Sequence, residues 1–354
     1  MEDTIEEKQV KRYREQISNL KKDYTFYDCH VHPYDVISEQ GDYHPNPFDK
    51  SIYSFINNRF IPPAIGSVSL KDGIIEGEIS DSKLLQKFIM MKGKQIYGHI
   101  GLKVLTANMD LSGIDQALLL QVAPREGDIL QKMQVMNEIF GNQSRFKLAG
   151  SVPNFIKNDH ISQYIKDQVQ LYHIRALKLH PIITGIDLAT NAGKERVERI
   201  LSACMESQLP LIVHGGKSFL FANMSEANYS LMENFEKINW GSGKSIVVIA
   251  HAGCYDCELK DIENIIIPRL RKMLQRYDNM MIDISGLGFK ALLMIIQNIE
   301  VNRILFGSDA LYYSQWSAVV KLFYAFQKTV KNYEENFLNV MSITPAQTVF
   351  REYK

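Results

Sequence analysis

The chain has 354 residues, of which 45% are hydrophobic and 23% charged, and its 40 basic and 40 acidic residues cancel. This balance, without any block of like charge, predicts no nucleic acid and no membrane as a partner and leaves a small-molecule substrate as the expected ligand. No apolar run has the length of a membrane span or the features of a secretory signal, so we expect a cytoplasmic protein, with homodimer formation left open.

The first 22 residues are charged at almost every turn and contain few apolar positions. This pattern is typical of a surface helix, so we assign residues 1–22 to an appended helix and 23–354 to one large domain. The first strand of that domain is expected in 24–33, YTFYDCHVHP, which a proline ends. Because side chains alternate along a strand, Asp28, His30 and His32 are predicted to share one face, about 6.5–7 Å apart.

A long segment separates this strand from the next regular pattern. Residues 35–80 are rich in turn formers and aromatic residues, which predicts an inserted lid or small subdomain over the carboxyl end of the strand. A first barrel helix is expected at about 82–108.

From about residue 114 onward, short β-branched apolar runs alternate with longer amphipathic stretches at roughly 30-residue intervals. This alternation predicts repeated βα units and an α/β fold, the (β/α)8 TIM barrel, with 331–354 as a final helical cap. An open doubly wound sheet is the alternative, but no glycine-rich phosphate turn follows an early strand. The seven further strands are expected in 114–124, 145–153, 174–181, 209–216, 245–253, 279–287 and 302–311.

Polar side chains gather at the carboxyl ends of these strands, where the active sites of such barrels lie. Five of the nine histidines take such positions, together with one lysine and one aspartate. They are His30, His32, Lys178, His180, His214, His251 and Asp309. Strand alternation predicts that Lys178 and His180 lie on one face of their strand, and that His251 lies on the face of Val247 and Ile249.

This set of side chains is suited to binding a metal. Neutral imidazoles and carboxylates are ligands that Zn²⁺ and similar ions accept, and catalytic sites leave one position open for water. The four expected ligands are His30, His32, His214 and Asp309. Asp309 would take the proton of the water, and His251 would polarise the substrate carbonyl or position the water.

The ordered motifs DCHVHP, LKLHP, LPLIVHGG, VIAHAG and ILFGSDA resemble the amidohydrolase superfamily, specifically its amidohydrolase-related hydrolases and decarboxylases, over most of residues 24–352. The resemblance implies a (β/α)8 barrel with one catalytic divalent metal, commonly zinc. Carried over by position, it implies the ligands His30, His32, His214 and Asp309, with His251 as the second-sphere catalytic histidine. The CYDC that follows the last motif histidine and the early insertion depart from the motif set.

Other residues at the strand ends are also assigned to the site. Lys178 has three interpretations: a carboxylated bridge to a second metal, a direct substrate contact, or a buried ion pair with a neighbour such as Asp283. His180 is expected to line the substrate site, and Arg125 to bind a substrate carboxylate unless it is an exposed loop residue. Asp28 would orient a ligand histidine through its second ring nitrogen or approach the metal itself.

Two motifs are set aside. The stretch GSGKS at 241–245 lacks the first glycine of a phosphate loop, since that position is Ile238, and it precedes a strand. Cys254 and Cys257 have the spacing of a thiol pair, but no second pair accompanies them. We expect all four cysteines to be reduced thiols.

The first functional hypothesis is a metal-dependent hydrolase that uses a metal-activated water on a C–N or ester bond of a small molecule. The second is a metal-dependent nonoxidative decarboxylase of the same family, in which the metal binds a substrate carboxylate or hydroxyl and a proton is delivered to carbon. Arg125 and Lys178 are the residues that make this reaction possible. The third is a metal-binding barrel without catalysis.

Overall fold

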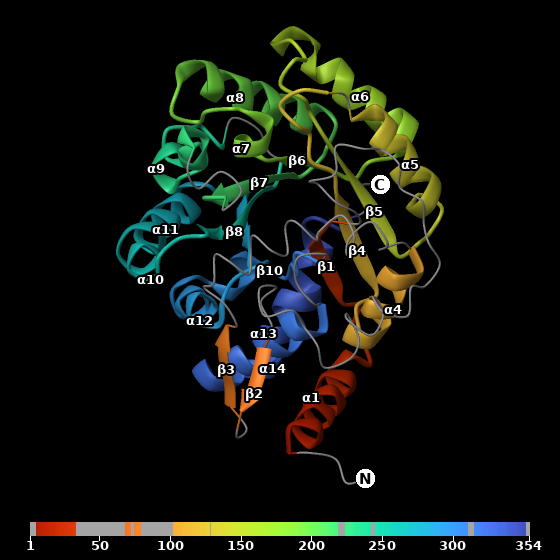
Figure 1. Ribbon diagram of the computed structural model, residues 1–354, viewed down its shortest axis with the longest axis vertical. Coiled ribbons are helices and arrows are strands. Elements are labelled where there is room, and N and C mark those ends of the chain that lie inside the picture. The colour runs from red at the N-terminus through yellow and green to blue at the C-terminus, as the bar shows by residue number, and fades with distance from the viewer. Residues whose placement is uncertain are drawn as a thin grey trace.

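The computed structural model describes residues 5–32, 68–71, 74–78, 102–127, 129–218, 224–241, 245–310 and 315–351. Eight parallel strands form a nearly closed TIM barrel, and all eight predicted strands are confirmed (Figure 1). They are β1 (Tyr27–Val31), β4 (Gln116–Leu120), β5 (Phe146–Ser151), β6 (Ala176–Leu179), β7 (Leu211–Gly216), β8 (Val247–Tyr255), β9 (Met280–Asp283) and β10 (Ile304–Leu305).

Helices connect successive strands on the outside of the barrel (Figure 1). The longer ones are α4 (Leu102–Ser112), α5 (Leu130–Phe140), α6 (Ile161–Tyr172), α8 (Asn191–Glu206), α11 (Ile267–Arg276), α12 (Phe289–Asn298) and α13 (Gln315–Thr329). Single-turn helices include α7 (Pro181–Thr184), α9 (Met232–Phe235), α10 (Leu259–Asp261), η1 (Asn158–His160), η3 (Ser225–Asn228) and η5 (Val301–Arg303). The π-helix η4 (Ile262–Ile266) precedes α11. The helices are amphipathic: α6, for example, buries Ile161, Ile165 and Gln168, which lie on one face.

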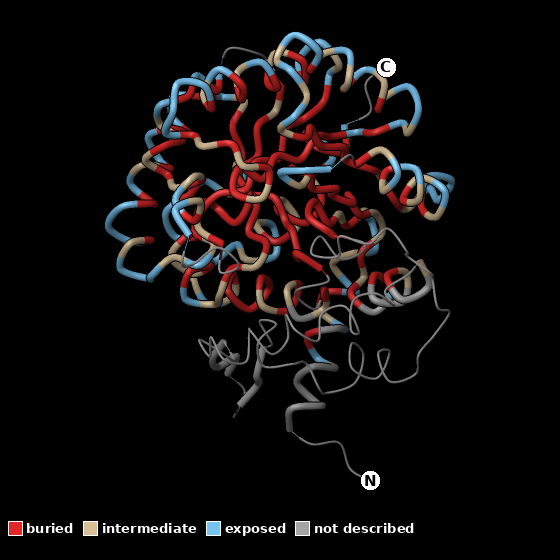
Figure 2. Tube along the Cα trace, turned by 45° about the horizontal axis from the view of Figure 1, so that its top comes forward, coloured by how far each residue is buried: buried red, intermediate tan, exposed pale blue. Residues whose placement is uncertain are grey.

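The strands carry two apolar layers. On β6, Leu177 and Leu179 belong to the outer layer beneath the helices, whereas Ala176 belongs to the inner layer within the barrel. Lys178 and His180 therefore lie on the inner face, as the alternation predicted. Buried residues concentrate at the centre of the molecule, and exposed ones follow the outer helices (Figure 2).

The alternation is interrupted on β1. Cys29 belongs to the inner layer and Val31 to the outer one, and the register of β1 on β4 shifts between Asp28 and Val31. This β-bulge directs His30 inward and leaves Asp28 on the other face. The prediction that Asp28 shares a face with the two histidines is therefore wrong.

A second interruption falls on β8. Val247 and Ile249 belong to the outer layer, and Val248 and Ala250 to the inner one. The backbone of His251 is left-handed, with φ of 56°. The prediction that His251 lies on the face of Val247 and Ile249 is wrong, because this conformation breaks the two-residue period.

The first and last strands meet through few main-chain contacts. An isolated parallel bridge joins Val31 to Ala310. The amide of His32 donates to the carbonyl of Ala310 at 2.9 Å, and the amide of Asp309 donates to the carbonyl of His30 at 2.9 Å. These bonds bring the carboxyl ends of β1 and β10 side by side.

The helix predicted for residues 1–22 corresponds to α1 (Ile5–Lys21). Its side chains Tyr13 and Ile17 are buried. The ring of Tyr13 packs edge-on against Phe323 and Tyr324 of α13, with centroids 6.0 and 6.1 Å apart. The helix is therefore held to the barrel by an apolar stripe.

Most of the predicted lid, 35–80, lies outside the described residues, except for the antiparallel hairpin of β2 (Val68–Lys71) and β3 (Ile74–Glu78). The helix expected at about 82–108 is represented by α4, which begins at Leu102, and residues 79–101 are also outside the described part. The predicted cap contains α14 (Tyr333–Leu338), the π-helix η6 (Asn339–Ile343) and α15 (Thr344–Gln347). Among the helices described, none combines the length and apolarity of a membrane-spanning segment.

Candidate metal centre

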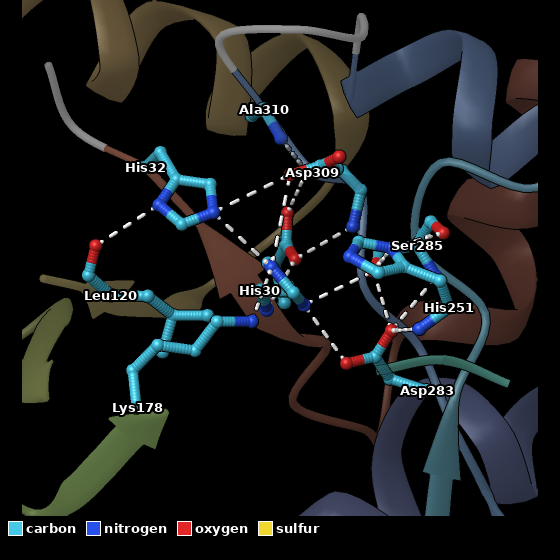
Figure 3. Close-up of polar contacts among 11 residues, drawn as sticks. His30, His32, Leu120, Lys178, His251, Asp283, Ser285, Asp309 and Ala310 are labelled. Carbon is cyan, nitrogen blue, oxygen red and sulfur yellow. Dashed lines mark hydrogen bonds and ion pairs between the residues drawn. The ribbon is translucent and has the colours of Figure 1, made fainter. Parts of the chain in front are cut away.

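Three side chains from the ends of β1 and β10 converge inside the barrel (Figure 3). The Nε2 atoms of His30 and His32 lie 3.3 Å apart. Oδ1 of Asp309 lies 3.7 Å from the first nitrogen and 3.6 Å from the second. Ligands bound tetrahedrally to Zn²⁺ at about 2.0–2.1 Å would be about 3.4 Å from one another, so the three atoms have the spacing of metal ligands.

The protons on the two imidazoles support the same conclusion. Nδ1 of His30 donates to Oδ2 of Asp283 at 2.9 Å, and Nδ1 of His32 donates to the carbonyl of Leu120 at 3.0 Å. Each Nδ1 therefore carries the proton, and each Nε2 presents a lone pair. Two imidazole lone pairs and a carboxylate oxygen that face one another are the donors that a divalent metal accepts, so this set fits such an ion.

Burial keeps the imidazoles neutral. Desolvation lowers the pKa of His32 to about 3 and holds the pKa of His30 well below its ordinary value, with the nearby charge of Lys178 acting in the same direction. Burial also raises the pKa of Asp309, an effect that the Lys178 ammonium opposes. Neutral imidazoles are the form that binds metals.

Lys178 reaches this cluster from β6. Its Nζ lies 3.3 Å from Nε2 of His30, and the residue is almost completely buried. Desolvation lowers the pKa of Lys178, and the negative charges of Asp283 and Asp309 oppose this shift. Within the described residues no ion pair joins Lys178 directly to Asp283.

Asp283, at the end of β9, is the carboxylate that orients His30. Besides the imidazole, it accepts hydrogen bonds from the amides of His251 and Ser285, each at 3.0 Å, and from the Ser285 hydroxyl. From the sequence we expected Asp283 only as an ion-pair partner of Lys178, and we assigned no role to Ser285. Their signal was present, because both lie at the carboxyl end of a predicted strand.

Asp28 has a different position from the one expected. Its carboxylate accepts hydrogen bonds from the amides of His30 and Ser308, from the Ser308 hydroxyl and from Nε2 of Gln315 on α13. None of the described hydrogen bonds joins Asp28 to an imidazole nitrogen. Asp28 therefore holds the main chain at His30 and at Ser308. Asp283, and not Asp28, is the carboxylate that accepts the hydrogen bond from the second ring nitrogen of His30.

His251 lies next to the cluster. Its ring centroid is 4.9 Å from that of His30, and its Nδ1 donates to the carbonyl of Ser285 at 2.9 Å. The described residues also group one nitrogen of His251 with a nitrogen of His30 and a carboxylate oxygen of Asp283. In this second group of possible ligands, His30 and Asp283 are already joined to each other by a hydrogen bond.

His214 is not brought into the three-atom cluster. Its Nε2 donates to the carbonyl of Lys217 at 2.9 Å, and its ring stacks on that of His180 with centroids 3.8 Å apart. The T-shaped contact with His251, at 4.9 Å, keeps it close to the site. Burial lowers the pKa of His214 to about 3, so this ring too is neutral.

Arg125 lies in the segment after β4. Its NH2 pairs with Oε1 of Glu226 at 3.1 Å, and its side chain is 49% exposed. Cys254 and Cys257 are free thiols at the end of β8 and beyond it. Burial raises the pKa of Cys257 to about 11 and that of Cys254 well above its ordinary value, so neither thiol is ionised near neutral pH.

Several solved structures share this fold. The 5-carboxyvanillate decarboxylase of Sphingomonas paucimobilis is 14% identical with a TM-score of 0.55, over 93% of this chain and 100% of that one. The 2,6-dihydroxybenzoate decarboxylase of Rhizobium is 13% identical with a TM-score of 0.52, over 74% and 92%. An amidohydrolase of Burkholderia multivorans, solved with bound zinc, is 10% identical with a TM-score of 0.52, over 92% and 99%.

No curated protein matches the chain significantly. The model of the family described as Amidohydrolase, in contrast, matches residues 27–329, which span β1 to α13 and include all the histidines and the aspartate of the candidate centre. This match confirms the resemblance drawn from the five motifs. The chain therefore belongs to the amidohydrolase family.

Proposed function

We propose that the protein is a metal-dependent hydrolase that cleaves a C–N or ester bond of a small molecule. The observation that carries this proposal is the convergence of Nε2 of His30, Nε2 of His32 and Oδ1 of Asp309, with a proton excluded from both nitrogens. A nitrogen and carboxylate donor set of this kind is accepted by Zn²⁺, and the related amidohydrolase with bound zinc supports that choice of ion. When bound, the metal would supply a Lewis acid that makes water a nucleophile near neutral pH.

The residues of the chain would manage the protons of this reaction. Asp309 has one oxygen in the cluster, and its second oxygen can accept a proton from the attacking water. The oxygen of that water forms a bond to the substrate carbonyl carbon, the bond to the leaving nitrogen or oxygen breaks, and Asp309 returns the proton to the leaving group. His251, whose Nδ1–H is held by Ser285, would orient the water or the carbonyl through its other nitrogen.

A nonoxidative decarboxylase is the second candidate. The observation that favours it is the buried ammonium of Lys178, which lies among neutral imidazoles and would attract a substrate carboxylate. Two of the similar structures are decarboxylases, which is compatible with this candidate. In this reaction the bond from carbon to the carboxylate breaks, and a proton is delivered to that carbon.

The two candidates give different products. Zinc-loaded protein is incubated with N-acyl amino acids, lactams, lactones and hydroxybenzoates, and the products are identified by mass. The addition of one water supports the hydrolase, and the loss of carbon dioxide supports the decarboxylase. If purified protein carries less than about a tenth of an equivalent of divalent metal and gains no activity on metal addition, both candidates are wrong.

A further inference from the structure

The hydrogen bonds around the histidines of the site fix which ring nitrogen carries the proton. The acceptors that face His30, His32, His214 and His251 are a carboxylate or main-chain carbonyls. Such oxygens only accept, so the bonded nitrogen is the protonated one. The remaining nitrogen in each of these four rings is an electron-pair donor.

His180 has the opposite arrangement. It precedes α7, and its Nδ1 accepts a hydrogen bond from the amide of Ile183 at 3.3 Å. A backbone amide only donates, so Nδ1 holds the lone pair and the single proton of the neutral ring lies on Nε2.

The Nε2–H group of His180 has no hydrogen-bond partner within the part of the chain that the structure describes. It is not among the fully buried atoms that lack a partner, so this N–H reaches the accessible surface although the residue is only 8% exposed. An accessible, unpaired donor at the carboxyl end of a barrel strand, on a ring that stacks against His214, is therefore suited to a bound ligand.

A second donor lies on the same strand face. Lys178 precedes His180 by two residues on β6, and its ammonium group can only donate. One of the three N–H groups of Lys178 faces Nε2 of His30 at 3.3 Å, which leaves two for a ligand. β6 therefore offers hydrogen-bond donors, whereas β1 and β10 offer the electron pairs of His30, His32 and Asp309. A metal cation would bind to the electron pairs at the ends of β1 and β10, and an oxygen atom of a ligand would accept hydrogen bonds from the N–H groups of β6.

We propose that Nε2–H of His180 and Nζ of Lys178 form a two-donor subsite for an oxygen of the substrate, either a carboxylate or a carbonyl oxygen. The identification of this ligand as the substrate rests on the proposed function. In this arrangement His180 is a binding residue that sets the orientation of the substrate relative to Asp309. The Nε2–H group of His180 would then donate to the substrate oxygen. The amide of Ile183 in α7 keeps the proton on Nε2, because it donates to Nδ1.

The tautomer can be measured without metal or turnover. In the full chain labelled with ¹⁵N-histidine, two-bond and three-bond couplings of the ring nitrogens distinguish Nε2–H from Nδ1–H, and the signals of His180 are those missing from His180→Asn. We expect Nε2–H for His180, and Nδ1–H for His30, His32 and His251. An Nδ1–H tautomer at His180 would overturn the proposal, whatever the catalytic activity proves to be.

Two substitutions separate binding from the structural role of the ring. His180→Asn places an acceptor where Nδ1 lies and so keeps the bond from Ile183, but it removes the outer N–H. His180→Gln places an N–H near the position of Nε2. Benzoate and benzamide serve as the carboxylate and carbonyl probes, and their binding to zinc-loaded protein is measured by calorimetry, with thermal unfolding followed in parallel.

We expect His180→Asn to weaken the probe that binds by about ten- to a hundredfold, as for a hydrogen bond to a charged acceptor, without a large change in Tm. His180→Gln should recover most of this loss, and His160→Asn, at an exposed residue, should have no effect. Tighter binding of benzoate assigns the subsite to a carboxylate, and tighter binding of benzamide assigns it to a carbonyl. Unchanged binding in His180→Asn, equal losses in both His180 variants, or binding of neither probe to the unsubstituted protein would each contradict the subsite.

Discussion

Nδ1 of His30 donates a hydrogen bond to Oδ2 of Asp283 at 2.9 Å, and both side chains are completely buried. The carboxylate fixes the tautomer of His30 and increases the basicity of Nε2. We therefore expect Asp283→Asn to lower zinc affinity by about 10- to 100-fold, because a neutral amide accepts the hydrogen bond more weakly. Competition with a chromophoric chelator measures the affinity.

The matched control for this substitution is Asp159→Asn, at a side chain that is 75% exposed. Like Asp283→Asn, it removes one carboxylate charge, but it does so at an exposed position. Equal affinities of the Asp283→Asn protein and this control would show that the carboxylate does not tune the ligand.

Metal binding should stabilise the fold at a single site. With free Zn²⁺ at a hundred times its Kd, the free energy of unfolding should rise by about 2.7 kcal/mol, as linkage requires. His32→Ala should remove most of this increase, because it deletes one of the converging nitrogens, whereas His160→Ala should leave it intact. Elemental analysis should give about one ion per chain. Two ions per chain would instead favour the carboxylated Lys178 of the sequence analysis.

Asp309 has one oxygen in the cluster and the other available for proton transfer. Asp309→Asn should lower kcat by about 10²- to 10⁴-fold, since an amide cannot accept the proton of the water. The rate is measured under saturating zinc with whichever substrate the product screen identifies, and Tm reports on the fold. A folded, zinc-loaded Asp309→Asn protein that retains full turnover would exclude this role.

Asp28 should give the protein a distinct pH dependence. Burial raises the pKa of Asp28 from 3.8 to about 6, against the hydrogen bonds from Ser308, Gln315 and the His30 amide. Since the raised pKa favours the protonated folded state, the associated stability is present below pH 3.8 and is lost as the pH rises through about 6. The shift corresponds to about 3 kcal/mol.

Urea unfolding of the metal-free protein and of Asp28→Asn, compared between pH 4 and 7, isolates this effect. The unfolding free energy of the unsubstituted protein should fall relative to that of the variant as the pH increases. A difference that stays constant across this range would mean that Asp28 titrates normally in the folded protein.

The sequence predicted the order and location of all eight barrel strands, because each strand lies in a short, largely apolar run with a clear end. It also predicted the faces of Lys178 and His180, since β6 is regular. Alternation failed for Asp28 and His251. A β-bulge and a left-handed residue each shift the two-residue period by one, and neither leaves a mark in the hydrophobic pattern.

The cluster itself was only partly predictable. His30, His32 and Asp309 converge as the motif order indicated, but His214 stands apart from them and stacks on His180. Asp283 was not recognised as the partner of His30, because the two lie 253 residues apart and the bond depends on how β9 faces β1 across the barrel. Sequence patterns identify strand ends, whereas contacts across the barrel depend on the three-dimensional closure of the sheet.

That closure has a consequence for folding. The bridge between Val31 and Ala310 joins strands from opposite ends of the domain, and the converging ligands sit on both sides of this junction. An ion held there would act as a cross-link between β1 and β10, closing a very long loop in the chain. If the junction between β1 and β10 opens before the remaining strands separate, His32 moves away from Asp309 and the ion is released. The rate of metal release would then measure the rate of this first step of barrel unfolding.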